Sequence, residues 1–143
     1  MKLRQQQDHK ETLLRGVTLF ETFSDDQIAE LGSIMRPQVF NDKEAIITQG
    51  EGYQSTYHLI KSGRCEAHID GVFSHTLGPG ASFGETALLY DSPPIATVRA
   101  AEDSDVTAWT VSREDFQRIV VDAAMNPARV TNVVNVSTGP GSK

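Results

Sequence analysis

The chain has 143 residues and a net charge of −6, so it is long enough for one domain with its own core, and its acidity argues against a nucleic-acid partner. Its single cysteine, Cys65, allows no internal disulfide and fits a reducing compartment. No apolar run approaches the ~20 residues of a membrane helix, and the polar N-terminus does not look like a signal peptide, so we expect a cytoplasmic protein without a membrane span.

The first third of the chain is predicted to be helical. Apolar residues recur at helical spacing from Leu13 to Phe20. A second helix is expected to begin after Ser24, because Gln27, three residues later, completes a capping box. This helix is expected to end near Pro37, since proline interrupts helical hydrogen bonding.

From Val39 to Ser112, short β-prone runs alternate with turn residues, which predicts a small barrel or sandwich. The stretches "KSGR" and "IDGV" are interpreted as hairpin turns, in which Gly63 and Gly71 supply the positive φ. One helical turn, expected over 84–90, interrupts the strands.

A further helix is expected after Ser112, which can act as its N-cap, and it is expected to end at Pro127. The stretch 128–136 is a weak candidate for one more helix, because it is rich in valine, threonine and asparagine. The predicted division is 1–35 for N-terminal helices, 36–112 for the strands, 113–137 for C-terminal helices and 138–143 for a disordered tail.

The turn at Gly84 carries the chemistry of this sequence. A helix N-terminus presents unpaired N–H groups and a partial positive charge, which suit an anion. Gly84 permits close approach of the backbone to a ligand, and the carboxylate of Glu85 can accept hydrogen bonds from the vicinal hydroxyls of a ribose. One turn could therefore hold a phosphate and a sugar together.

The run "FGETALLYDSPPIATVRA" strongly resembles the phosphate-binding cassette of cyclic-nucleotide-binding domains, above all those of cyclic-AMP- and cyclic-GMP-dependent protein kinases. That family's pattern is F-G-E-x-A-L-x-Y-x-x-P-R-x-A-T-V. The resemblance extends over nearly the whole chain and implies an α+β fold, in which helices flank a small antiparallel β-barrel of the jelly-roll-like β-roll kind. The matching residues are Phe83, Gly84, Glu85, Ala87, Leu88, Tyr90, Pro93, Ala96, Thr97 and Val98.

The resemblance also implies residue roles within this cassette, residues 83–98. Glu85 would bind the ribose 2′-hydroxyl, and Leu88 would be an apolar relay that repacks against the C-terminal helices. Gly84, Ala87 and Ala96 would offer backbone contacts to phosphate and sugar. The expected ligand-contact residues are Gly84, Glu85, Thr86, Ala87, Ile95, Ala96 and Thr97.

Pro94 departs from the family pattern, because it stands where the family has the arginine that pairs with the cyclic phosphate. Loss of one member of a close, desolvated charge pair costs ~2–5 kcal/mol, or roughly 30- to 3,000-fold in affinity. Arg99 lies at an odd offset from Pro94 in a strand and is expected to face the other way. Ile95 stands where cyclic-GMP-selective domains often place threonine, which weakens a preference for cyclic GMP.

Two functions follow as hypotheses. The first is a regulatory module of a cyclic-nucleotide-dependent kinase system that binds cyclic AMP or cyclic GMP weakly, or a nucleoside-like molecule instead. The second is a docking module that binds no nucleotide and works through contacts with neighbouring kinase or cyclic-nucleotide-binding domains. The sequence contains no hydrolase, Walker or zinc-protease motif and its histidines lack zinc-site spacing, so we expect neither catalytic residues nor a metal or cofactor.

The region after Phe116 contains no aromatic residue. Family members usually cover the bound base with an aromatic or long side chain from this region or from a partner domain. We therefore expect a bound base to stay largely uncovered, with residues from about 128 onward mobile.

Overall fold

The computed structural model describes residues 2–52, 55–89 and 92–125, and the chain divides into two compact units. The helical unit comprises the chain up to Ile34 and from Glu114 onward, and the β-unit comprises Met35–Arg113. Several predictions fall outside the described residues. They are the weak helix expected over 128–136, the tail over 138–143 and the mobility expected from about residue 128 onward. No helix in the described ranges combines the length and apolar character needed to cross a bilayer.

The second helix of the helical unit, α2 (Asp25–Ile34), begins with a capping box in the predicted place. The N–H of Gln27 donates to Ser24 Oγ at 3.1 Å, and the N–H of Ser24 donates to Gln27 Oε1 at 2.9 Å. Each bond satisfies a backbone donor that a helix start would otherwise leave unpaired. The unit contains α1 (Lys2–Arg15), the 3-10 helix η1 (Thr18–Phe20), α2 (Asp25–Ile34) and most of α3 (Arg113–Met125).

The predicted bounds of the first helix need a correction. The first helix ends at Arg15, so Val17 and Phe20 belong to the turn and to η1 that follow it. The second helix ends at Ile34, near Pro37 as predicted. Phe20 nevertheless packs inward, with its ring centroid 5.2 Å from Phe23 and 6.0 Å from Phe116. The spacing of the apolar residues from Leu13 to Phe20 therefore indicated which residues are buried, but it did not indicate one continuous helix.

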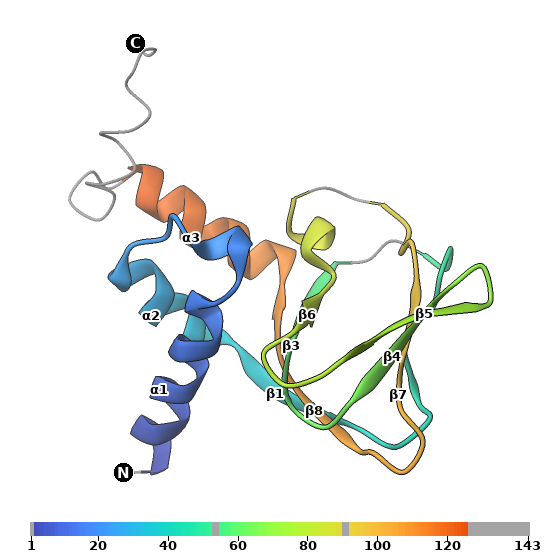
Figure 1. Ribbon diagram of the computed structural model, residues 1–143. Coiled ribbons are helices and arrows are strands. Elements are labelled where there is room, and N and C mark those ends of the chain that lie inside the picture. The colour runs from blue at the N-terminus through green and yellow to red at the C-terminus, as the bar shows by residue number, and fades with distance from the viewer. Residues whose placement is uncertain (1, 53–54, 90–91, 126–143) are drawn as a thin grey trace. The chain divides into compact units, whose positions relative to one another are not determined.

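The β-unit contains two four-stranded antiparallel sheets, ordered β1-β8-β3-β6 and β2-β7-β4-β5. They face each other across one core, to which Phe40 and Ile60 contribute from the first sheet and Cys65 and Val98 from the second (Figure 1). The predicted α+β fold, a small antiparallel β-roll with flanking helices, is confirmed. The strands are β1 (Arg36–Phe40), β2 (Ala45–Ile47), β3 (Thr56–Ser62), β4 (Cys65–Ile69), β5 (Val72–Leu77), β6 (Ser82–Phe83), β7 (Thr97–Ala100) and β8 (Val106–Ser112), and the 3-10 helix η2 (Glu85–Leu88) follows β6.

Of the two predicted hairpin turns, one is confirmed and one is wrong. Asp70 and Gly71 have φ values of 53° and 80° and join the paired strands β4 and β5, as in a type I′ turn. Gly63 has a φ of 93°, but it joins β3 to β4, which lie in different sheets. A glycine turn in the sequence indicates a left-handed residue without indicating whether the flanking strands pair.

Gly63→Ala is expected to destabilise the β-unit by more than about 2 kcal/mol, because it adds left-handed strain to a steric clash. A Cβ atom at Gly63 would lie 2.2 Å from the carbonyl oxygen of Asp105. The matched control is Gly71→Ala, which has φ of +80° with nothing within 4 Å of the added Cβ and is expected to cost only about 1 kcal/mol. Urea denaturation followed by fluorescence of Trp109, which is 2% exposed on β8, measures both. Equal losses in the two variants would contradict the steric argument.

Candidate functional site

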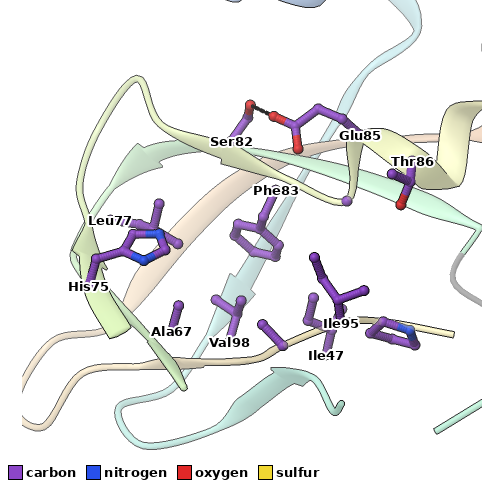
Figure 2. A pocket seen from close by; sticks show the side chains of 13 residues that line it. Ile47, Ala67, His75, Leu77, Ser82, Phe83, Glu85, Thr86, Ile95 and Val98 are labelled. Carbon is purple, nitrogen blue, oxygen red and sulfur yellow. Dashed lines mark hydrogen bonds between the residues drawn. The ribbon is translucent and has the colours of Figure 1, made fainter. Parts of the chain in front are cut away.

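A cavity of about 250 Å³ opens in the β-unit where both sheets meet the cassette (Figure 2). Glu85 and Thr86 come from η2, and His75 and Leu77 come from β5. The residues that line it are Ile47, Ala67, His75, Leu77, Ser82, Phe83, Gly84, Glu85, Thr86, Pro94, Ile95, Ala96 and Val98. Most of these side chains are apolar, which is typical of a small-molecule site with a few orienting polar groups.

The glycine–glutamate turn is a short 3-10 helix rather than the longer helical turn expected. Gly84 precedes η2 with φ of 86°, in the left-handed region that glycine adopts without strain. Of the expected stretch, Tyr90 lies outside the described residues. The Glu85 carboxylate accepts a hydrogen bond from Ser82 Oγ at 2.8 Å, which fixes its orientation at the cavity wall. A ribose hydroxyl could occupy the remaining acceptor positions of this carboxylate.

The structure brings most of the predicted contact residues together. Gly84, Glu85, Thr86, Ile95 and Ala96 all line the cavity. Ala87, Leu88 and Thr97 are not among the lining residues. Ala87 is fully buried and Leu88 is 1% exposed. The Thr97 hydroxyl accepts the N–H of Gln49 at 2.9 Å. Backbone contact by Ala87 and the relay role of Leu88 stay predictions.

Pro94 lines the cavity, and its carbonyl accepts the N–H of Gly50 at 2.9 Å. Arg99 faces away from it, as predicted: its exposed guanidinium donates to the carbonyl of Lys43 at 3.3 Å, whereas Val98 beside it lines the cavity. Among the described lining residues there is no lysine or arginine, so Glu85 and His75 are the only ionisable side chains there.

His75 also lines the cavity, although it is not among the contact residues predicted from the sequence. Its Nδ1 lies 3.0 Å from the hydroxyl oxygen of Ser74, and the ring projects from β5 beside Leu77 (Figure 2). His75 and Leu77 are two residues apart and so share one face of the strand. A strand over "VFSHTL" could have indicated that His75 and Leu77 share a face. It could not have indicated that this face borders the cassette.

Two buried residues of β3, Tyr57 and His58, adjoin residues that line the cavity. Burial raises the pKa of Tyr57. The hydrogen bond with Ser82 opposes this rise, and the Glu85 carboxylate adds to it. The ring of His58 stacks on Phe83, with centroids 4.8 Å apart and planes 9° apart. Burial lowers the pKa of His58 to about 4, because the charged imidazolium is poorly solvated there.

Because of His58, the free energy of unfolding is therefore expected to decrease as the pH is lowered. Its pKa is lower in the folded state than the ordinary 6.5, so the unfolded chain binds the proton more readily as the pH falls from 6.5 towards 4. The expected contribution is a loss of about 2 kcal/mol between about pH 7.5 and pH 5. Urea denaturation at both pH values measures the loss, and His58→Phe, which keeps a ring against Phe83, should reduce it. An unchanged pH dependence in this variant would assign the effect to other groups.

Comparison with known proteins places these features in a family. A family model, "Cyclic nucleotide-binding domain", matches residues 37–122. A cAMP-dependent protein kinase regulatory subunit from Debaryomyces hansenii is 39% identical over 88 residues, which cover 61% of this chain and 19% of that protein.

Two solved structures have the same fold. One is the regulatory subunit of a cAMP-independent protein kinase A from Trypanosoma cruzi bound to guanosine, with TM-score 0.75, 24% identity and coverage of 85% of this chain and 42% of that chain. The other is a Trypanosoma brucei counterpart with TM-score 0.75, 21% identity and coverage of 85% and 44%. It is a variant, with one threonine replaced by arginine and two other residues by alanine, bound to cAMP in its A site. The chain spans less than half the length of each of these proteins.

Proposed function

The chain belongs to the cyclic nucleotide-binding domain family, and we propose that it is a regulatory ligand-binding module of a kinase system whose cavity prefers an uncharged nucleoside to a cyclic nucleotide. The likeness to kinase regulatory subunits supports the regulatory role and a kinase as the partner. The free, buried thiol of Cys65 is consistent with a cytoplasmic setting.

The charge balance of the cavity carries this proposal. A cyclic phosphate is an anion, and a buried anion is costly unless a cation or several donors face it. The described lining supplies no lysine or arginine, and it does supply the carboxylate of Glu85. The substitution of arginine by Pro94 therefore leaves the phosphate without its partner and leaves the ribose contact in place.

A nucleoside can bind in the same cavity without the cost of burying an anion. Its ribose hydroxyls can donate to Glu85, and its base can lie against apolar side chains such as Leu77 and Val98. The Trypanosoma cruzi relative is cAMP-independent and holds guanosine, which is a precedent for such a ligand in this fold. The Trypanosoma brucei structure that holds cAMP in its A site is that of a variant in which one threonine is replaced by arginine and two other residues by alanine.

A thermal unfolding panel tests the proposal. Adenosine, guanosine, cyclic AMP and cyclic GMP are added at one millimolar-range concentration, and a ligand that binds the folded state raises the Tm. We expect at least one nucleoside to raise the Tm more than the cyclic nucleotide with the same base does. Larger shifts with both cyclic nucleotides would overturn the proposal.

The docking module remains a second candidate because of the apolar side chains beside the cavity. Ile95 is 80% exposed and Leu89 is 54% exposed, although both are large and apolar. A neighbouring domain could cover them and close the site. In that case no ligand of the panel would shift the Tm, whereas a tandem neighbour or kinase domain would.

A further inference from the structure

Gln49, just after β2, makes hydrogen bonds in two directions. Its side-chain Nε2 donates to Asp70 Oδ1 at 2.9 Å, and its Oε1 accepts the N–H of Asp70 at 2.8 Å. Its own N–H donates to the Thr97 hydroxyl at 2.9 Å, and the N–H of the next residue, Gly50, donates to the carbonyl of Pro94 at 2.9 Å. One dipeptide thus binds two segments that are far apart in the sequence.

Both segments adjoin neighbouring strands of one sheet, ordered β7-β4-β5, and both parts of the chain contribute to the cavity lining. Asp70 forms the turn between β4 and β5, which contribute Ala67, His75 and Leu77 to the lining. The segment that includes Pro94 and Thr97 contributes Pro94, Ile95, Ala96 and Val98. β4 also pairs directly with β7, but this pairing ends at His68 and Thr97. Beyond that pair, Gln49 links the β4–β5 turn, through its side chain, to the end of the cassette, through its backbone N–H.

We propose that Gln49 is a positioning residue that couples the β4–β5 turn to residues 94–97, so that a change in one of these segments reaches the other. The amide side chain makes both bonds to Asp70 because its Nε2 donates and its Oε1 accepts. A methionine has similar length and can do neither well, and a glutamate would place a second carboxylate against Asp70. The response to ligand, unlike the coupling itself, rests on the proposed function.

Amide hydrogen exchange of the free protein tests the coupling without any ligand. In Gln49→Met the Asp70 amide loses its acceptor directly, so faster exchange there is expected on any account. The informative amides are those of Gln49 and Gly50, whose own acceptors on Thr97 and Pro94 are untouched by the substitution. We expect them to exchange about fivefold faster as well, the scale of one net hydrogen bond. The control is Gln38→Met, the same change at an exposed glutamine on β1.

Faster exchange confined to Asp70 would overturn the proposal, because the turn would then be held independently of the cassette. A second arm uses guanosine as the probe. In the wild type, guanosine should slow exchange at Asp70, and in Gln49→Met it should still bind while the Asp70 amide no longer responds. Guanosine that fails to bind the wild type would count against the proposed function alone, since the free-protein arm still decides the coupling. A guanosine response at Asp70 that persists in Gln49→Met would overturn the coupling.

Discussion

Pro94→Arg is expected to strengthen cyclic AMP binding at least tenfold over the wild type. Pro94 already lies in the cavity lining, and the hydrogen bond from Gly50 to its carbonyl does not depend on the side chain, so the backbone path should persist. An arginine there would face the phosphate and restore part of the ~2–5 kcal/mol that a close charge pair carries. Titration calorimetry measures the gain. Adding Ile95→Ala should increase the gain in affinity, because the isoleucine side chain narrows the cavity beside residue 94.

The matched control is Pro93→Arg, which removes a proline and adds the same charge one residue earlier. Pro93 is exposed and is not among the lining residues, so we expect little gain from it. Combining Pro94→Arg with Glu85→Ala should lose the gain if the ribose contact is real. Equal strengthening by both arginine variants would show a general charge effect, and no gain from Pro94→Arg would favour the docking module.

Glu85→Ala is expected to weaken guanosine binding by about 10- to 100-fold, because a hydrogen bond to a charged group contributes about 1.5–3 kcal/mol. The carboxylate is oriented by Ser82 and lines the cavity, so little side-chain entropy opposes the contact. Glu85→Gln keeps the size and one acceptor and should lose less.

The loss should be specific to one hydroxyl of the ligand. In the wild type, 2′-deoxyguanosine should bind more weakly than guanosine, and in Glu85→Ala the two should bind alike. Calorimetry with both ligands on both proteins closes this double-mutant cycle. A full preference for guanosine that survives in Glu85→Ala would place the 2′-hydroxyl elsewhere.

Features encoded within a few adjacent residues could be predicted from the sequence. The Ser24–Gln27 capping box, the Asp70–Gly71 turn and most of the cassette wall depend on neighbours in the chain. The outward direction of Arg99 followed from strand alternation alone. The length of the turn after Gly84 did not follow, because a 3-10 turn and a short α-helix have the same start signals.

Features that need long-range pairing could not be predicted. The turn at Gly63 connects different sheets, and only the pairing of β3 with β8 and of β4 with β7 decides this. His75 reaches the cavity because β5 pairs with β4, which also contributes Ala67 to the lining. Gln49 bonds to residues 21 and 48 positions away, a contact that no local spacing encodes.

The central claim is that the cavity discriminates against the phosphate while accepting the base and ribose. Guanosine and cyclic GMP differ in that phosphate, so calorimetric titration of the wild-type protein with each at physiological salt is the most direct test. We expect guanosine to bind more tightly, and cyclic GMP to bind only at high micromolar concentration or not measurably. Nanomolar binding of cyclic GMP, with guanosine weaker, would show that another group supplies the missing charge and would contradict the account.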